Sequence, residues 1–580
     1  MADSSLDPQA RPGYPRPGRC PPRPLAHWRR DLAADSGPWR TAFAALYGDD
    51  ESLLQERRRA WLALLDTFEA SYSAGDDPAS RQAGVLLVRA PARINIMGVH
   101  IDHRKGEVNY LTHRREVLMV AQPRSDDTVR LCNADPAAFP ARSFSLREEI
   151  ARGDWANWMA YIESPGVTET VAATQGDWAN YVKSSMLRLQ HWVGERPLRG
   201  MNLAVAGDIP LSAGLSSSSA VVVATAVACV ALNDIDVPPA QLVDLCGEGE
   251  WYVGTRGGAG DHAAMLFGRR GLVSHVGFFP CRLLCYVPAP EGCDVVVCNS
   301  LRQARKSRAE LSAYNETIAA YRTVLMLMKE ILREQMGFHR SLLEERIQHL
   351  GDFNPNRDLF PDVVLYRLLK LMPPLITREE LLARLPDEAD ALGAVFRTHD
   401  PPARGYRPRP VAMFGLSEIA RGAACVDLLR AGDLRGLGDL MYISHDGDRI
   451  VTWDSRGRTT PWDNDATRVT DAYLDRLIED LESGDANRAC AARLMFQPGG
   501  YRCSSEELDQ IVDICRSTEG VLGAGLTGAG FGGCVLALVE KGSTPALLAA
   551  LRARYYDPRS LPFAAEPCVP VEGAGTVCLG

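Results

Sequence analysis

The serine-rich segment 210–220 (PLSAGLSSSSA) contains the groups that proteins use to hold a phosphate. A turn with Gly214 leads directly into a run of small apolar residues that has the character of a buried helix. The first N–H groups of a helix lack backbone partners and lie at the positive end of its dipole, so they favour an anion. A serine N-cap on an ordinary helix would fit the same residues, and the GxxxxGK[ST] sequence of a P-loop is absent. We predict that nucleotide phosphates bind here, at Gly214, Leu215, Ser216, Ser217, Ser218 and Ser219.

Two carboxylates, Glu250 and Asp261, flank a loop that contains four glycines. One carboxylate can hold Mg²⁺ while the other accepts or orients the proton of a substrate hydroxyl, which is the division of roles that phosphoryl transfer requires. Asp261 also lies where it would cap a short helix predicted at 263–267, so a purely structural role stays open from these residues alone.

The glycine-rich segment 527–534 (TGAGFGGC) satisfies the spacing GxGxxG, so a dinucleotide-binding oxidoreductase has to be weighed. That fingerprint follows a strand and opens a helix near the start of a βαβ unit. Here it precedes a predicted strand near the C-terminus. We therefore predict a hairpin-like glycine turn that presses against another loop, and no bound nicotinamide or flavin. The glycines concerned are Gly528, Gly530, Gly532 and Gly533.

The segment 93–103 (RINIMGVHIDH) gathers Arg93, His100, Asp102 and His103 directly after a predicted strand. An arginine can stabilise the charge of a transferred phosphoryl group, and an aspartate can accept hydrogen bonds from neighbouring sugar hydroxyls. The histidines would fit equally well as satisfied surface residues. Without further ligands nearby in the sequence, we predict no metal role for them.

These segments must be positioned by helices and strands that do not alternate regularly, which favours an α+β architecture in two lobes over a doubly wound sheet. The proline in the first strand predicts an edge or a bulge there. Strands are predicted at 85–96, 115–121, 128–132 and 534–539, and helices at 39–72, 215–231, 308–336, 360–371, 415–431 and 508–516.

The composition is that of a globular protein, with 580 residues, 46% hydrophobic and 24% charged. This length favours two domains or more, and the net charge of -9 argues against a nucleic-acid or anionic-membrane partner. The 15 cysteines show neither a CxxC pair nor a Cys/His spacing, so we expect reduced thiols and no zinc site. Neither a secretory signal nor a bilayer-length apolar run is visible, and we expect a cytoplasmic protein without a membrane partner.

Together and in this order, the four segments resemble the GHMP kinases, and the galactokinase branch most closely. RINIMGVHIDH is similar to the galactokinase signature, PLSAGLSSSSA to the serine-rich second motif of the family, and LTGAGFGGCVLALV to its glycine-rich third motif. The resemblance covers most of residues 40–580. The proline-rich start, 134–174 and parts of 332–410 fall outside it.

The resemblance implies a two-lobed GHMP kinase fold, with a ribosomal-protein-type N-terminal lobe and a ferredoxin-like α+β C-terminal lobe. From the seven prolines between Pro8 and Pro24, we expect residues 1–35 to be a disordered or loosely docked extension. An ATP-binding N-terminal domain would follow at 36–300, with an insertion at about 134–174. The C-terminal domain would then span 301–580, and the active site would lie between the two.

The resemblance also implies an activity, namely ATP-dependent phosphorylation of the anomeric hydroxyl of galactose or a related sugar, with ATP and Mg²⁺ as cofactors. Carried over residue by residue, it implies that Asp261 is the catalytic aspartate and Arg93 the arginine beside it. Ser217 or Ser218 would bind Mg²⁺ with Glu250, and the sugar contacts would be His100, Asp102, Gly258 and Tyr314. The four glycines of the third motif would support the phosphate loop and the substrate.

Val99 departs from the galactokinase pattern, in which a glutamate before the histidine binds the hydroxyl on sugar carbon 6. Loss of a buried hydrogen bond changes selectivity by about 1–3 kcal/mol. Loss of the carboxylate also removes repulsion against a uronate, and galacturonokinases resemble the chain at this position. Arg104, Lys105 or Arg256 could pair with a uronate carboxylate, or each could be solvated.

Two alternatives to a galactose kinase therefore remain at this stage. One is a galacturonokinase or another uronate or pentose 1-kinase. The other is a catalytically silent regulator that binds sugar and ATP, against which the intact Arg93, Glu250 and Asp261 argue. The expected partner is a small sugar, and a monomer is expected.

Overall fold

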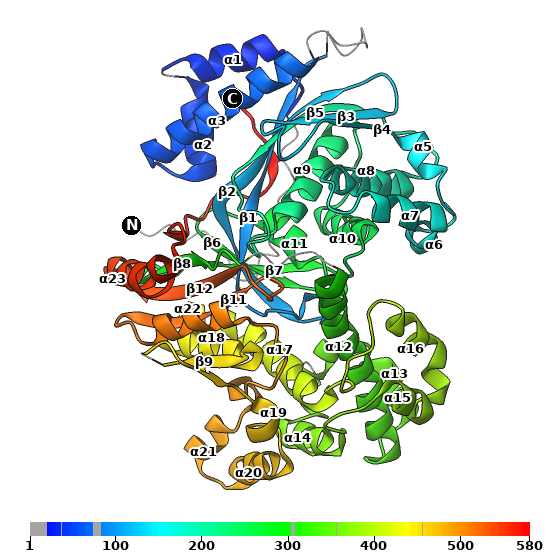
Figure 1. The fold of residues 1–580 in the computed structure, drawn as a ribbon, viewed down its shortest axis with the longest axis vertical. Coiled ribbons are helices and arrows are strands. Elements are labelled where there is room, and N and C mark those ends of the chain that lie inside the picture. The colour runs from blue at the N-terminus through cyan, green and yellow to red at the C-terminus, as the bar shows by residue number, and fades with distance from the viewer. Residues whose placement is uncertain are drawn as a thin grey trace.

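The computed structural model describes residues 20–35, 37–72, 83–302, 308–354, 356–454 and 456–579. They form two lobes, with the N-terminal lobe in the upper half of Figure 1 and the C-terminal lobe in the lower half. Helices and strands are mixed without regular alternation. The predicted α+β, two-lobed architecture is therefore confirmed.

The N-terminal lobe is built on an eight-stranded sheet in the order β14-β1-β2-β5-β3-β4, with β6 paired to β2 and β7 paired to β6. In β1, the pairing with β2 shifts register between Pro91 and Ala92, which is the predicted bulge. The strands are β1 Leu86–Met97, β2 Glu107–Pro123, β3 Thr128–Asn133, β4 Arg142–Ser145, β5 Met201–Gly207, β6 Leu272–Gly277, β7 Arg282–Pro288 and β14 Gly575–Thr576.

Side chains alternate between the two faces of this sheet because successive residues of a strand point in opposite directions. Leu87 packs in the apolar cluster formed with the first three helices, whereas Val88 packs in the main core of the protein. One face is covered by α1 Leu25–Ala33, α2 Pro38–Tyr47 and α3 Glu51–Tyr72, and the other by α8 Ala179–Val193, α9 Ser217–Leu232, α10 Pro239–Glu250 and α11 Gly260–Phe267. The segment at 134–174 adds β4 and three short helices, α5 Leu146–Ile150, α6 Trp158–Glu163 and α7 Pro165–Ala173.

The C-terminal lobe contains an antiparallel four-stranded sheet in the order β11-β12-β8-β13. In chain order these strands are second, third, first and fourth, which is the ferredoxin-like arrangement that was predicted. The strands are β8 Cys293–Asn299, β11 Val521–Thr527, β12 Cys534–Glu540 and β13 Ala565–Pro567. They pack on α22 Glu506–Arg516 and α23 Thr544–Leu551, and β11 also packs on α18 Leu434–Asp448.

Between β8 and α22 the chain forms a helical region that fills the lower part of Figure 1. Two long helices, α12 Arg308–Glu334 and α17 Pro408–Ala431, pack on each other at its centre. Around them lie α13 Arg340–Arg346, α14 Asp362–Leu371, α15 Arg378–Arg384, α16 Ala389–Phe396, α19 Asn464–Thr467, α20 Asp471–Glu482 and α21 Ala486–Ala491, with a small hairpin of β9 Val451–Trp453 and β10 Thr459–Pro461. No helix in the described part of the chain is both long and apolar enough to cross a membrane.

The prediction of a disordered or loosely docked extension at 1–35 is wrong for its second half, which is folded and firmly packed. Residues 25–33 form α1, in which Trp28 and Leu32 are fully buried, and the Trp28 indole donates to the Val85 carbonyl at 3.0 Å. Burial of an indole with its hydrogen bond satisfied anchors this segment to the lobe. Residues 1–19 lie outside the described part of the chain.

The domain boundary predicted at 300 also differs from the structure. Strand β8 precedes residue 300 but forms an inner strand of the C-terminal sheet. Strand β14, close to the C-terminus, returns to pair with β1 of the N-terminal sheet. Pairing between segments so distant in sequence could not be inferred from local patterns.

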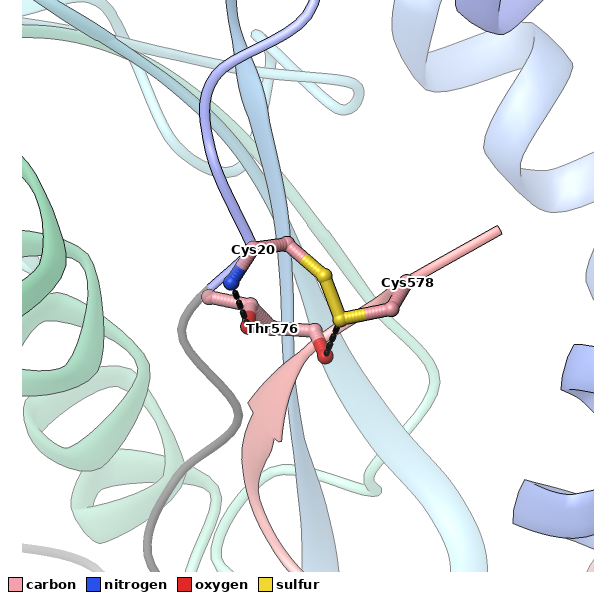
Figure 2. Close-up of a disulfide and its surroundings, with 3 residues drawn as sticks. All are labelled: Cys20, Thr576 and Cys578. Carbon is pink, nitrogen blue, oxygen red and sulfur yellow. Dashed lines mark hydrogen bonds between the residues drawn. A yellow bond between two sulfur atoms is a disulfide. The ribbon is translucent and has the colours of Figure 1, made fainter. Parts of the chain in front are cut away.

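A disulfide between Cys20 and Cys578 joins the first described segment to the last (Figure 2). The Cys20 N–H also donates to the Thr576 hydroxyl at 3.3 Å, so the two segments are held by more than the sulfur atoms. This corrects the expectation that all cysteines are reduced thiols. The other 13 cysteines are free, and most of them are buried.

We expect the Cys20→Ser, Cys578→Ser double variant to unfold at a lower urea concentration, with a loss of about 2–4 kcal/mol, because the cross-link restricts the unfolded chain. Cys490→Ser, which removes the exposed free thiol, is the matched control and should unfold like the wild type. Equal urea midpoints for the double variant and the wild type would show that the cross-link adds no stability.

Candidate active site

The Asp261 carboxylate is held by two side chains from different elements. Its Oδ1 accepts a hydrogen bond from Arg93 Nε at 2.7 Å, and its Oδ2 accepts one from the Ser216 hydroxyl. Arg93 comes from β1, Asp261 from the first turn of α11 and Ser216 from the turn before α9. The structure thus brings together residues that three separate sequence segments supply.

Arg93 is buried, whereas the Asp261 side chain is 34% exposed. Burial disfavours the charged guanidinium, but the Asp261 carboxylate outweighs this effect and raises the pKa of Arg93 above its ordinary value. Arg93 also donates to the Gly214 carbonyl at 2.5 Å, which fixes the serine-rich turn to β1. The result is a fixed carboxylate with an accessible edge beside a permanent positive charge.

Ser216 occupies the N-cap position of α9 in a left-handed conformation, with φ of 61°. Its hydroxyl is directed to Asp261 and makes no capping hydrogen bond to the helix. The first-turn N–H groups of α9 therefore receive no side-chain cap from this residue and are suited to hold an anion. Ser217 and Ser218 are half-buried in this turn, and the Gly214–Leu215 turn leads into it.

Glu250, the last residue of α10, lies next to the same helix start. Its Oε2 accepts a hydrogen bond from Ser219 at 2.8 Å and lies 3.0 Å from His262 Nε2. A carboxylate beside a hydroxyl provides the oxygen ligands that Mg²⁺ prefers, so these residues fit that ion. Ser219 was predicted for phosphate but not for this contact, and His262 was missed although it adjoins Asp261 in the sequence.

The glycine-rich turn between β11 and β12 packs directly on the serine-rich turn. A Cβ at Gly528 would lie 2.7 Å from the Gly214 carbonyl oxygen, and a Cβ at Gly533 would lie 2.8 Å from that of Ala213. A Cβ at Gly530 would lie even closer to a backbone atom, 2.3 Å from the Cys503 carbonyl oxygen. All four motif glycines, Gly528, Gly530, Gly532 and Gly533, have positive φ. The predicted turn between strands is therefore present, and the helix that a dinucleotide fingerprint requires does not follow it.

Asp102 lies beside the loop that precedes Asp261, in a single helical turn at Asp102–Arg104. It accepts the Gly260 N–H at 3.1 Å, and a Cβ at Gly258 would lie 2.2 Å from its Oδ2. Burial opposes its ionisation, but hydrogen bonds from His103 and Gly260 prevail and lower the pKa of Asp102 to about 2. Burial lowers the pKa of His103 to about 4, so at neutral pH the pair is a carboxylate and a neutral imidazole.

Tyr110, on β2, is a buried member of this cluster that the sequence did not reveal. A Cβ at Gly260 would lie 2.2 Å from its hydroxyl oxygen. Burial and the nearby carboxylates of Asp102 and Asp261 raise the pKa of Tyr110 well above its ordinary value, so the phenol is neutral. Only its place on the strand after the signature could have drawn attention to it.

The two remaining signature residues make their contacts with the C-terminal lobe. Val99 is buried at 5% exposure, and its N–H donates to Glu418 of α17 at 3.0 Å. The His100 Nε2 lies 3.5 Å from Asp448 Oδ2, at the end of α18. Tyr314 lies in α12, but its side chain is outside the described residues.

The three basic residues near the signature have different surroundings. Lys105 pairs with Asp352 at 2.7 Å, and Arg256 pairs with Glu163 at 3.3 Å. Arg104 lies over the Tyr321 ring and donates to the Ile318 carbonyl, and burial lowers its pKa to about 10. Two of these three basic side chains, Lys105 and Arg256, are thus already paired with carboxylates of the protein itself.

Known families match the segments that build this cluster. The galactokinase galactose-binding signature matches residues 68–123, the N-terminal domain of GHMP kinases matches residues 180–269, and their C-terminal domain matches residues 474–557. The chain belongs to the GHMP kinase family. Arg93 and Asp102 lie in the first match, and Ser216, Glu250 and Asp261 lie in the second.

Individual relatives agree with this assignment. The galactokinase of Chloroflexus aggregans is 26% identical over 498 residues, which is 85% of this GHMP kinase and 93% of that protein. The galactokinase of Dictyostelium discoideum is 23% identical over 516 residues, 87% and 89% of the two chains. A crystal structure of Lactococcus lactis galactokinase with galactose shares the fold, with a TM-score of 0.57 at 23% identity over 89% of this chain and 99% of that one. These relatives favour the galactokinase branch over the uronate and regulator alternatives.

We expect Gly528→Ala to lower kcat/KM for the nucleotide by about 10- to 100-fold, because a side chain there displaces the serine-rich turn from its position beside Asp261. Gly542→Ala is the matched control, since Gly542 has a similar φ of 93° but open space around it. Steady-state kinetics of both variants measure the difference. If both lose the same amount, the cause is strain at positive φ and not the contact with Gly214.

Proposed function

We propose that this GHMP kinase transfers the γ-phosphoryl group of MgATP to the anomeric hydroxyl of galactose. The observation that carries the proposal is the Asp261 carboxylate, fixed by Arg93 and Ser216 at the start of α9. A carboxylate, a buried cation and an uncapped helix start at one place are the parts that phosphoryl transfer to a hydroxyl requires. The galactokinase relatives support galactose as the acceptor.

Asp261 orients the sugar hydroxyl and accepts its proton as the hydroxyl becomes a nucleophile. Its exposed edge allows approach of the hydroxyl, while Arg93 and Ser216 prevent the carboxylate from rotating away. Arg93 remains charged throughout and stabilises negative charge that develops near Asp261. The chain therefore contributes positioning and electrostatics more than covalent chemistry.

MgATP supplies the phosphoryl group and the divalent charge when it is bound. The residues that would hold it are the first-turn serines of α9, with Ser217 or Ser218 and Glu250 toward Mg²⁺. The glycine turn at 528–533 supports this loop from behind through the backbone contacts at Gly214.

Asp102 accepts hydrogen bonds from sugar hydroxyls, and Gly258 keeps the space above it free. Asp102 is ionised at every pH at which the enzyme is expected to work, because its pKa is about 2. We also place His100 and Val99 in the proposed sugar subsite, because they lie in the same turn as Asp102. Tyr314 is a further proposed contact of the sugar.

The assay that tests the proposal is ADP release over galactose, galacturonate, glucuronate, arabinose and N-acetylgalactosamine. We expect galactose to give the highest kcat/KM, and Asp261→Asn to lower kcat by about 10²- to 10⁴-fold, because the variant cannot accept a proton. A thermal melt checks that the variant is folded. ADP release that no sugar stimulates above the Asp261→Asn level would disprove the proposal.

Asp102→Asn should raise the KM for galactose by about 10- to 100-fold, with a smaller effect on kcat, because a charged acceptor is lost from sugar binding. Asp352→Asn is the matched control. It removes the partner of Lys105, which directly follows the helical turn of Asp102, but it removes no proposed sugar contact. The low pKa of Asp102 means that its carboxylate stays ionised as the pH falls from 8 to about 5, so the wild-type KM should show no rise from this group over that range. Equal KM values for the two variants would count against a direct contact with the sugar.

A further inference from the structure

His100, Asp448 and Cys503 form a buried cluster. The reaction described above uses only His100 of the three, as part of the proposed sugar subsite. One ligand atom from each residue lies within 4.8 Å of the corresponding atoms of the other two. His100 belongs to the turn between β1 and β2, Asp448 is the last residue of α18, and Cys503 lies just before α22. Three segments that are far apart in the sequence therefore direct metal-binding side chains to one point.

The charge of Asp448 requires compensation, because the residue is completely buried. Among the described residues, its Oδ1 accepts only a long hydrogen bond, from the Cys503 N–H at 3.4 Å, and its Oδ2 has no hydrogen-bond donor. Within the described part of the chain, the one basic side chain at ion-pair distance is the His100 imidazole, at 3.5 Å. A buried carboxylate without a firm partner costs several kcal/mol in general, so something further is expected to bind here.

The His100 ring presents an unsatisfied atom to the same point. Its side chain is 7% exposed, and its buried Nε2 makes no hydrogen bond to any residue that the structure describes. The ring is fixed by Tyr501, whose centroid lies 4.8 Å away, and by a backbone φ of 62° that is uncommon outside glycine. A strained backbone that orients an unsatisfied imidazole nitrogen is typical of a functional position.

Cys503 completes the cluster with a thiol that is 1% exposed. Its backbone is firmly placed, since its carbonyl accepts the Phe531 N–H of the glycine-rich turn at 2.6 Å, and the neighbouring Ser504 N–H donates to the Asp448 carbonyl at 3.0 Å. The thiol is thus held at the junction of α18 and the glycine-rich turn.

We propose that His100, Asp448 and Cys503 bind a Zn²⁺ ion. Thiolate, imidazole and carboxylate are the three ligand types that zinc accepts in proteins, and the combination of thiolate with imidazole disfavours Mg²⁺ and Ca²⁺. On binding, the Cys503 thiol loses its proton to solvent, and two anionic ligands and one neutral imidazole then balance the charge of the ion. Three protein ligands leave one tetrahedral position for a water or hydroxyl oxygen.

Such an ion would tie the sugar-binding signature of the N-terminal lobe to the C-terminal lobe. It would connect the turn that carries Asp102 with the segment that supports the glycine-rich turn. This role is separate from that of Mg²⁺ at Glu250, and it does not depend on which sugar is phosphorylated. Failure of the kinase assay and failure of the zinc proposal are therefore distinguishable.

Cobalt substitution tests the proposal, because a cysteine thiolate bound to Co²⁺ gives a near-ultraviolet charge-transfer absorption band. The full chain carrying Cys490→Ser, which removes the exposed thiol, is titrated with Co²⁺ in the presence of Mg²⁺ and without thiol reductants. We expect one equivalent of Co²⁺ to produce the band and one equivalent of Zn²⁺ to remove it. Absence of the band, as expected of a simple His100–Asp448 ion pair, would overturn the proposal.

Two ligand variants, Cys503→Ala and Asp448→Asn, and one control variant, Cys515→Ala, assign the ligands. Cys503→Ala should abolish the band, whereas Cys515→Ala, which removes an equally buried thiol in α22, should retain it. Asp448→Asn should keep a thiolate band but bind Co²⁺ at least about 10- to 100-fold more weakly, as expected when a group that charges and orients a metal site is neutralised. Circular dichroism shows whether each variant is folded. A band of unchanged affinity in folded Cys503→Ala would assign the metal to other thiols and refute the site.

Discussion

The buried Arg93 guanidinium is the interaction on which the rest of the site depends. It binds the Asp261 carboxylate on one side and the Gly214 carbonyl on the other, so one side chain of β1 fixes both the start of α11 and the turn before α9. A buried guanidinium without such partners would cost several kcal/mol, and the two elements are therefore coupled through it. Ser216 closes the arrangement, because its hydroxyl binds Asp261 and is thereby withheld from capping α9. The same geometry that positions the carboxylate thus leaves a helix start suited to a phosphate.

A second constraint is the close backbone contact between the serine-rich and glycine-rich turns. The turn after β11 belongs to the C-terminal sheet, yet it packs on Gly214 at a distance that no side chain would allow. Glycine at positive φ is required on both sides, since any Cβ would separate the two turns. The lobes are therefore joined at the place where the nucleotide phosphates are proposed to bind. Motion of one lobe relative to the other would displace the serine-rich turn directly.

The sequence predicted the local elements of this fold well and the long-range pairings poorly. The helix after the serine-rich turn, the bulge at Pro91 and the turn before β12 all follow from short patterns of apolar residues, glycine and proline. The pairing of β14 with β1 and the disulfide between Cys20 and Cys578 depend on segments at opposite ends of the chain. Docking of α1 was missed for a related reason, because prolines before residue 25 concealed a short helix whose buried residues, Trp28 and Leu32, pack on distant parts of the lobe. Chain topology is what brings these pairs together, and a single sequence does not display it.

The candidate site shows the same division. The motif carboxylates Asp261 and Glu250 both contact the serines at the start of α9, whereas Tyr110 and His262 have no motif of their own. His100 illustrates the limit most clearly. The sequence near His100 has no Cys/His spacing of a zinc site, and so no metal role was predicted for it. Asp448 and Cys503 follow hundreds of residues later, without the spacing of a zinc motif, and only the packing of α18 against the signature turn places them beside the imidazole. The proposed metal site is indicated by a buried carboxylate and a buried imidazole with unsatisfied atoms, and not by a sequence motif.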